Sequence, residues 1–275
     1  MSTLDAPLPT ADRPMASASG VTHTVPAARG IAVRSLRNIR RLPSAFLPAL
    51  LMPIVQCIAF SGTFFAITQI PGFPTDRSIN WFMPLAVVMG SSFAGIGIGL
   101  TTVRDLESGF YDRLRMAPTP RRSLLLGPLL SAWARVLVVV TVVFLFGLLL
   151  GARLTGGILG LLPLYVAGLG IAVVSTGWAL GLAFRFRDMR AAAIMQLTLF
   201  LSLFLTTAQA PLEVMEGWLY DVARLNPLTR VLDLARMGFL GELTWSDTWP
   251  GLLALAVLSA LAMVWARTGL NRLDR

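Results

Sequence analysis

The sequence contains no lysine, one cysteine (Cys57) and one histidine (His23) among its 275 residues. A single cysteine excludes an internal disulfide bond, and one cysteine with one histidine argues against a Cys/His metal site or a histidine-based catalytic triad. Without lysine the chain cannot contain the phosphate-binding loop G-x-x-x-x-G-K-[ST]. If ATP drives this protein, ATP and magnesium therefore bind to another chain, and we expect no cofactor, metal ion or catalytic residue here.

Charged residues are also scarce. They make up 13% of the chain, whereas 55% is hydrophobic, and the mean hydropathy is +0.71. A bilayer core about 30 Å thick needs roughly 20 apolar residues per helix. A spanning segment must satisfy its own backbone hydrogen bonds, and a barrel would show short alternating segments instead of long apolar runs. The composition therefore predicts an all-α integral membrane protein.

The apolar runs predict six membrane-spanning helices. They cover about residues 45–70, 81–103, 124–150, 158–184, 191–208 and 249–267. Residues 1–28 are rich in proline, alanine, serine and threonine, which predicts a disordered cytoplasmic tail before a membrane domain at 29–275.

Residues 29–42 predict an amphipathic helix at the membrane interface, because apolar side chains can share one of its sides. Its basic side would face lipid phosphates and consists of Arg34, Arg37, Arg40 and Arg41. A plain basic flank of the first span would carry the same charge and stays an alternative.

The segment at residues 209–248, between the fifth and sixth spans, is semi-polar. Its apolar pieces, 212–219 and 231–240, are too short to cross a bilayer. We expect re-entrant or interfacial helices on the outer side, and we call residues 209–248 the cap.

The net charge of +9 has a distribution that fits a membrane protein rather than one that binds nucleic acid. Arginines concentrate in the N-terminal segment, in alternate loops and at the C-terminus, as retention of positive charge in the cytoplasm requires. Both termini and the loop at residues 104–122 are therefore expected in the cytoplasm. We expect a multi-pass protein surrounded by lipid in the plasma membrane of a bacterium.

The loop RDLESGFYDRLRMAPTPRR (residues 104–122) is the densest charged segment of the chain. A short mixed-charge helix with an apolar ridge suits a groove on a partner protein. Gly109 allows a bend before the helix, and the prolines after it stop the helix. The candidate docking residues are Arg104, Asp105, Glu107, Gly109, Phe110, Arg113, Leu114 and Pro118. A solvated loop without a partner is the alternative.

Polar residues inside the predicted spans are few. Gln56, Gln196 and Gln209 either line a polar cavity or form hydrogen bonds between helices. Arg135 is expected to snorkel toward the cytoplasm or to pair with a loop carboxylate. No aspartate or glutamate lies well inside a span, which argues against an ion-coupled carrier. The predicted spans also lack the nucleophile with a base, or the metal pair, that an intramembrane enzyme would need.

Small residues recur at a spacing of four in three of the predicted spans. Ser91, Gly95 and Gly99 form one such ridge, which predicts close helix packing.

Two segments resemble one family. The loop at residues 104–122 resembles the cytoplasmic loop of ABC-2-type exporter permeases, in which an acidic residue, a glycine, a leucine and a proline recur before a basic pair. Residues 210–241, APLEVMEGWLYDVARLNPLTRVLDLARMGFLG, resemble that family's signature after the fifth span. The matching positions include Pro211, Trp218, Asn226, Pro227 and Arg236. The resemblance covers nearly the whole chain from residue 29, and permeases of daunorubicin-resistance-type drug exporters are the most similar subgroup.

The resemblance implies a half-transporter that is not itself an enzyme. Two permease chains, identical or paralogous, would pair, and each would dock one soluble ATPase subunit carrying ATP and magnesium. Residues 109–115 would be the coupling helix, and residues 209–248 an extracellular cap. The cargo would be a hydrophobic or amphipathic compound moved outward, with a lipid-linked glycan or a cell-envelope lipid as the alternative cargo.

Overall fold

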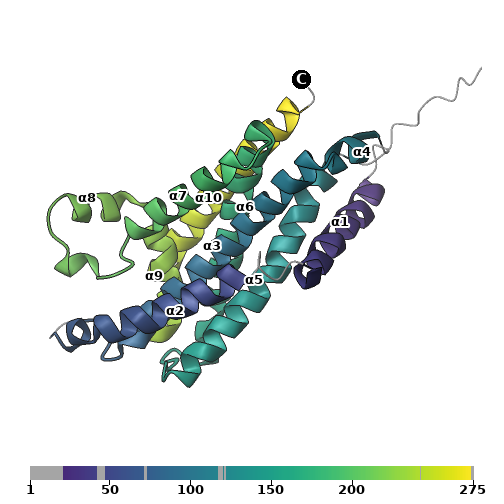
Figure 1. The fold of residues 1–275 in the computed structure, drawn as a ribbon. Coiled ribbons are helices and arrows are strands. Elements are labelled where there is room, and N and C mark those ends of the chain that lie inside the picture. Colours follow the sequence, from purple (N-terminus) through teal and green to yellow (C-terminus); the bar gives the residue numbers. More distant parts are fainter. Residues whose placement is uncertain are drawn as a thin grey trace, which may run out of the picture.

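The structure is a computed structural model that describes residues 21–41, 47–70, 73–116, 120, 122–241 and 243–273. Within these residues every regular element is a helix, which confirms the all-α prediction (Figure 1). The elements are α1 (Val21–Arg41), α2 (Leu47–Thr63), η2 (Phe65–Gln69), α3 (Ser78–Glu107), α4 (Phe110–Met116), α5 (Ser123–Leu149), η3 (Ile158–Gly160), α6 (Leu161–Phe186), α7 (Arg190–Phe204), η4 (Leu212–Val214), α8 (Trp218–Leu225), α9 (Pro227–Leu240) and α10 (Trp245–Arg272).

Four helices are long and apolar enough to cross a membrane: α3, α5, α6 together with η3, and α10. The first and fifth predicted spans correspond to shorter helices, α2 with 17 residues and α7 with 15. Helix α7 ends at Phe204, before the expected residue 208. At this end the Asn226 side chain donates hydrogen bonds to the carbonyl oxygens of Ser202 and Leu205 at 2.8 Å. Four of the predicted spans therefore have helices of sufficient length, and the crossing of α2 and α7 stays a prediction.

Helix α3 lies at the centre of the bundle, in contact with α2, α5, α6 and α9. Its small-residue ridge faces α6: a methyl group at Gly95 would overlap Ser175, and one at Gly99 would overlap Ala179. The predicted close packing along Ser91, Gly95 and Gly99 is confirmed, because only small side chains allow the two helices to approach this closely.

Helix α10 packs along α6, and aromatic residues mark their contact. The indoles of Trp178 and Trp265 are stacked with ring centroids 5.4 Å apart. The guanidinium of Arg185 lies over the Trp265 ring at 3.4 Å from its centroid and donates a hydrogen bond to Thr268. This stack of two indoles and one guanidinium fixes α10 against α6.

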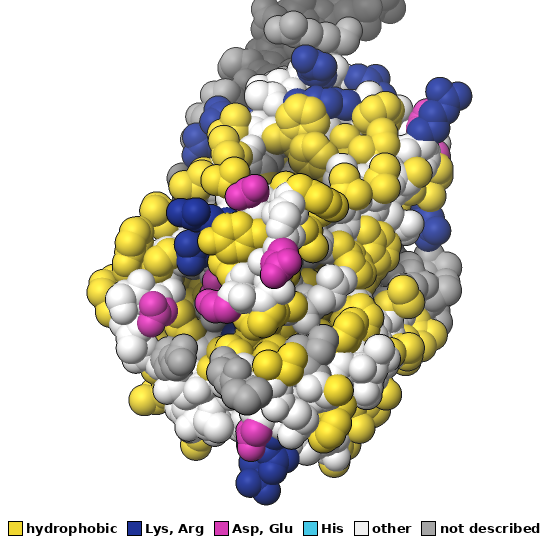
Figure 2. All heavy atoms as spheres, turned by 90° about the vertical axis from the view of Figure 1, so that its left-hand side faces the viewer, with side chains coloured by type: hydrophobic (Ala, Val, Ile, Leu, Met, Phe, Trp, Pro, Cys, Tyr) yellow, Lys and Arg dark blue, Asp and Glu magenta, His cyan; other side chains and the backbone are white. Residues whose placement is uncertain are grey.

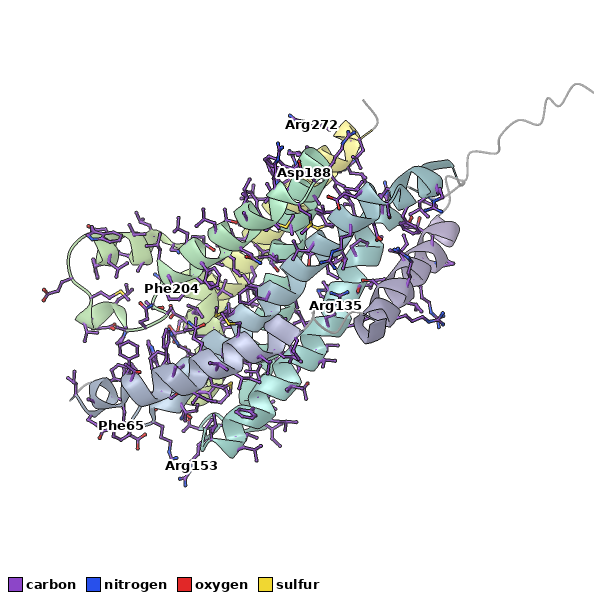
Figure 3. The ribbon with its side chains drawn as sticks, viewed as in Figure 1. Phe65, Arg135, Arg153, Asp188, Phe204 and Arg272 are labelled. Atoms are coloured by element: carbon purple, nitrogen blue, oxygen red, sulfur yellow. The ribbon has the colours of Figure 1, made fainter. Side chains whose placement is uncertain are left out.

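The loops alternate between the two ends of the bundle as the charge pattern predicts. Figure 3 shows Asp188 and Arg272 at one end and Phe65 and Arg153 at the opposite end. We call the end with α4 and the C-terminus the inner end, following the predicted orientation. The end with η2 and η3 is the outer end.

Helix α1 begins at Val21, before the expected start at residue 29, so the part of the predicted tail at residues 21–28 is helical. Residues 1–20 lie outside the described part of the chain. The helix continues through Pro26 because it packs on α5: Ala28 is 1% exposed, and its carbonyl lies beside Gly127. The sequence does not predict a helix start at Val21, because a proline inside a helix costs about 3 kcal/mol unless packing compensates.

Candidate functional site

The site at the inner end begins where α3 stops. Helix α3 ends at Glu107, and Gly109 has a left-handed backbone with φ of 68°. A residue without a Cβ adopts this conformation without strain. The turn at Gly109 starts α4 directly after α3, as the sequence predicts.

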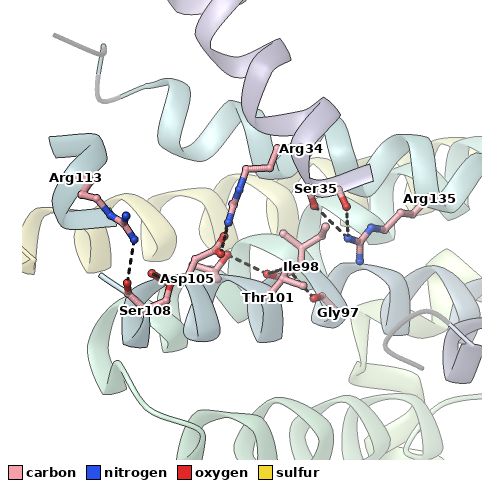
Figure 4. A network of polar contacts seen from close by, with 10 residues as sticks. Arg34, Ser35, Gly97, Ile98, Thr101, Asp105, Ser108, Arg113 and Arg135 are labelled. Carbon is pink, nitrogen blue, oxygen red and sulfur yellow. Dashed lines mark hydrogen bonds and ion pairs between the residues drawn. The ribbon is translucent and has the colours of Figure 1, made fainter. Parts of the chain in front are cut away.

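Arg34 of α1 contacts both α3 and α4 at this point, and Figure 4 shows its contact with Asp105 of α3. Its two terminal nitrogens donate hydrogen bonds to the two carboxylate oxygens of Asp105 at 2.8 and 2.7 Å. Its guanidinium also lies over the ring of Phe110, 3.7 Å from the ring centroid. The hydrogen bond to Asp105 raises the pKa of Arg34 above its ordinary value. Bidentate pairs of this kind are among the stronger polar contacts in proteins. We call Arg34, Asp105 and Phe110 the inner node.

The inner node changes the expectation for the basic side of α1. Arg34 was expected to face lipid phosphates, but it faces Asp105, because α1 packs along α5 beside the end of α3. Arg37 is exposed, and the side chains of Arg40 and Arg41 lie outside the described part of the structure.

The apolar side chains of α4 pack on this chain's own helices. Phe110 and Leu114 are half-buried against a cluster that includes residues of α3, α5, α6 and α10. Tyr111 is 5% exposed, and its ring meets Phe110 and Phe184 edge to face with centroids 6.2 and 5.8 Å apart. The expected apolar ridge for a partner is therefore directed inward, since α4 lies across the ends of the long helices. Sequence reasoning missed Tyr111, although its spacing from Leu114 places both on one helix face.

The side chains that remain accessible at this end are polar. The exposed described residues of the predicted docking set are Arg104, Glu107 and Arg113. Arg113 donates a hydrogen bond to the carbonyl of Ser108 at 3.4 Å. Pro118 lies outside the described residues. A partner at this end would therefore meet charges first, with the apolar ring of Phe110 beneath Arg34.

Arg135 lies in α5 and is only 3% exposed (Figure 3). Its guanidinium donates hydrogen bonds to the backbone oxygen and the hydroxyl of Ser35 at 3.2 and 3.1 Å (Figure 4). Arg135 therefore bonds to α1 and not to the expected loop carboxylate, because α1 covers this side of α5.

At the start of α9, Asn226 joins two helices through one side chain. Its amide oxygen accepts a hydrogen bond from the backbone of Leu228 at 3.0 Å and so caps α9. Its amide nitrogen caps the end of α7, as described above. Pro227 occupies the first turn of α9, where its missing N–H leaves no helix hydrogen bond unmade.

Arg236 is buried at the outer end, with 1% of its surface exposed. It donates hydrogen bonds to the carbonyl and hydroxyl of Thr207 at 2.7 and 3.1 Å, and its guanidinium lies 3.7 Å from the ring centroid of Trp81. Asp233 lies 3.8 Å away. Arg236 thus ties α9 to α3 and to the segment after α7.

The remaining cap positions differ in burial. Pro211 is buried, whereas Trp218 on α8 is 69% exposed, and α8 stands away from the long helices (Figure 1). Helix α9, by contrast, packs among α3, α6 and α10, so it belongs to the bundle rather than to an exposed surface layer.

The three glutamines lie in separate parts of the described chain, and their place on a transport path stays a prediction. Gln196 is exposed on α7, one position after the buried Met195, and therefore faces away from the bundle. Gln209 is half-buried in the cap, while Gln56 lies in a small crevice with Phe60 of α2. The three residues come from separate segments, and the sequence pattern within each segment does not predict how the segments pack together.

Two larger cavities have other linings. One of about 580 Å³ lies between α6, α7 and α10, and its polar residues are Ser92, Ser175, Thr198, Ser202 and Asn226. The second, of about 1200 Å³, lies at the outer end and contains charged residues. Figure 2 shows the side where the cap projects, with acidic side chains spread among hydrophobic ones. No group of histidine, cysteine or carboxylate side chains among the described residues could hold a metal ion.

Long apolar helices form a bundle, with the short charged helix α4 across one end and the buried helix α9 of the cap at the other. This is the architecture of a multi-pass membrane protein. The family model described as "ABC-2 type transporter" matches residues 27–240. The chain therefore belongs to the ABC-2 type transporter family, as its two motifs indicate.

Its relatives fit this assignment. The chain is 25% identical over 240 residues to the "Daunorubicin resistance ABC transporter permease protein DrrB1" of Streptomyces coeruleorubidus, covering 85% of this chain and 81% of that protein. It is 26% identical over 226 residues to the "Putative transport permease ycf38" of Pyropia yezoensis, covering 80% and 76%. The protein of the same name from Cyanophora paradoxa is 28% identical over 208 residues, covering 72% and 69%. Permeases of this family are membrane components of transporters rather than enzymes, and the family implies an ABC ATPase partner and a dimeric arrangement.

Proposed function

We propose that this chain is the permease subunit of an ATP-driven exporter that moves a hydrophobic or amphipathic compound out of the cytoplasm or the inner leaflet. The observation that carries this proposal is the inner node, which fixes the surface helix α4 to α1 and α3 through one arginine. In the proposed assembly two permease chains pair, each binds one ATPase subunit, and both termini lie in the cytoplasm.

The inner node would transmit a movement of α4 to the membrane helices. Asp105 belongs to α3 and Phe110 to α4, while Tyr111 continues the contact to Phe184 of α6. A force on α4 therefore moves α3 and α6 with it. In this scheme closure of the ATPase subunits on ATP biases the bundle between two arrangements, and each arrangement exposes a different end of the transport path.

The cargo is inferred from chemistry and from one relative. The 580 Å³ cavity has no charged residue in its lining and carries mainly apolar side chains, which suits a compound with a large apolar surface. A sugar-rich head group would need many more polar partners. The name of the Streptomyces relative, which refers to daunorubicin resistance, supports a drug-like cargo.

The test is reconstitution. The chain would be purified gently with whatever ATPase subunit accompanies it, placed in proteoliposomes, and assayed for ATP-dependent uptake of daunorubicin into vesicles whose ATPase side faces out. The control is the same complex with a hydrolysis-deficient ATPase. We expect uptake only with the active ATPase. Transport that needs an ion gradient and no ATPase would refute the proposal.

A further inference from the structure

The 580 Å³ cavity is a cleft between α7 and α10, which both pack on α6. It opens at the side of the bundle, because Leu261 in its lining is 63% exposed. Leu261 belongs to α10, a helix long enough to cross the membrane, so the opening faces the region that lipid tails occupy. A ligand can therefore enter the cleft from within the bilayer.

The hydroxyl and amide groups of the cleft have their partners within the protein. The hydroxyls of Ser92, Ser175, Thr198 and Ser202 each donate a hydrogen bond to a carbonyl of their own helix, at distances between 2.7 and 3.0 Å. The Asn226 amide is occupied by α7 and α9, as described above. The lining contains no charged side chain. Because these groups need no partner from a ligand, the part of a ligand that fills the cleft is best made of hydrocarbon.

The first charge beyond the inner end of the cleft is positive. There the stacked indoles of Trp178 and Trp265 separate the cleft from Arg185, whose guanidinium lies over the Trp265 ring. The Trp265 N–H has no partner, but it is buried beside Gly181 and is not accessible to a ligand. An anionic group just beyond the indoles would therefore meet a cation, while a chain attached to it could pass into the cleft.

Two further arginines lie beside Arg185, and we call the three the arginine cluster. Arg187 donates a hydrogen bond to the carbonyl of Arg272 at 3.0 Å, and Arg272 is close enough to Arg185 for their like charges to repel each other. Within the described residues, none of the three forms an ion pair with a carboxylate, since Asp188 pairs with Arg190. The cluster therefore lacks a counter-charge from this part of the chain, and an anion from outside would relieve the repulsion.

The backbone at Arg187 is strained. Its φ is 57°, and it is the only described residue other than glycine in the left-handed region. Arg187 ends α6 in this conformation, at a position where glycine would fit without strain. Strained residues of this kind concentrate at functional sites, so the position favours a role for the arginine side chain.

The depth of the cleft matches one leaflet of a membrane. Half of a bilayer core is about 15 Å thick, and a helix rises about 1.5 Å per residue. Ten residues of α6 outward from Arg185 therefore lead through one leaflet and end at Ser175, in the lining of the cleft. A lipid whose phosphate lies at the arginine cluster has acyl chains that end at this level.

We propose that the arginine cluster and the cleft together bind one anionic phospholipid of the inner leaflet. Its phosphate contacts the arginines, and one acyl chain lies in the cleft between α7 and α10. This binding requires neither the ATPase nor transport, so it can fail or succeed independently of the proposed export function.

The test is native mass spectrometry of the full chain, purified in a mild detergent and titrated with lipid. The probes are phosphatidylglycerol, which is anionic, and phosphatidylcholine with the same acyl chains, which has no net charge. Glycerol 1-phosphate, which has the phosphate without the chains, serves as a competitor. We expect phosphatidylglycerol to bind at least about fivefold more tightly than phosphatidylcholine, and glycerol 1-phosphate not to displace it.

Charge variants test the arginine cluster. Arg272→Gln and Arg187→Gly should each weaken phosphatidylglycerol binding about three- to tenfold, because each removes one cation from the phosphate. Arg187→Gly should also keep or raise the thermal midpoint, since glycine relieves the strained backbone, whereas a merely structural arginine would lower it. The control is Arg153→Gln, which removes an exposed arginine at the outer end and should leave affinity within about twofold of the parent.

Two tryptophan variants on α10 test the cleft. Leu261→Trp enlarges a side chain of the lining and should weaken phosphatidylglycerol binding at least about fivefold. Val264→Trp adds the same side chain at a position that is 61% exposed, nearly as exposed as Leu261, but outside the lining. It should leave affinity within about twofold of the parent.

Several outcomes would overturn the proposal. Equal binding of the two lipids, or equal losses in Arg272→Gln and Arg153→Gln, would show that the arginine cluster does not select the head group. Displacement by glycerol 1-phosphate, or equal effects of the two tryptophan variants, would show that no acyl chain occupies the cleft. Loss of a co-purifying ATPase in Arg272→Gln with unchanged lipid binding would assign the cluster to that partner instead.

Discussion

Asp105→Asn tests the inner node with little change in shape. The substitution keeps the size of the side chain but removes the charge that Arg34 contacts through two hydrogen bonds. Hydrogen bonds to charged groups contribute about 1.5–3 kcal/mol, and exposed pairs much less. The side chains of this pair are 38% and 23% exposed, so we expect a loss of about 1–2 kcal/mol.

The magnitude can be measured in a double-mutant cycle with Arg34→Gln. Because both single changes break the same contact, the double variant should lose little more than either single one, with a coupling of about 1–2 kcal/mol. The assay follows ATP hydrolysis and transport in the reconstituted complex, together with thermal unfolding of the purified permease. Transport should fall more than hydrolysis, since α4 would move without α1 and α3.

Glu216→Gln is the control, because it neutralises an exposed carboxylate in the cap, outside the docking loop. It should leave coupling almost unchanged. If Asp105→Asn behaves like Glu216→Gln in both assays, or if Asp105→Asn and Arg34→Gln are additive, the node does not transmit force and the reasoning fails.

Three further predictions concern single residues. Gly109→Val should strain the left-handed turn by about 1–2 kcal/mol and reduce ATP-coupled transport, with normal membrane insertion, as a transport assay and a membrane-fraction blot will show. Asn226→Ala removes the cap of α9 and two hydrogen bonds to α7, so the thermal midpoint of the purified permease should fall while the ATPase subunit still co-purifies; loss of the ATPase would contradict this. Gly95→Val should overlap Ser175 and sharply lower the monodisperse fraction in size-exclusion chromatography, whereas Gly62→Val, at an open position, should not; equal yields would refute the packing argument.

Features that depend on local patterns could be predicted from the sequence. The apolar runs predict the four long helices, because a helix that crosses a bilayer needs about 20 consecutive apolar residues, which can be seen directly in the sequence. The small-residue ridge at Gly95 and Gly99 likewise reflects spacing along one helix. The turn at Gly109 follows from its neighbours in the chain.

Features that depend on which helices become neighbours could not be predicted. Arg34 and Asp105 are 71 residues apart, and no spacing rule links them. The inward direction of Phe110 follows from the position of α4 across the bundle, so the same apolar pattern fits a partner or the chain's own core. The directions of Gln56 and Gln196 could not be predicted for the same reason, since only tertiary packing orients the faces of α2 and α7.

The packing of α1 on α5 sets an order for synthesis. Ser35 leaves the ribosome 100 residues before Arg135, the residue that it contacts in the folded chain. At about 5–20 residues per second, α1 waits roughly 5–20 s before its partner helix exists. During that time its apolar side has only lipid or a chaperone to cover it. The contact of α1 with Arg135 therefore forms late in biogenesis, after Asp105 and Phe110 of the inner node have been synthesised.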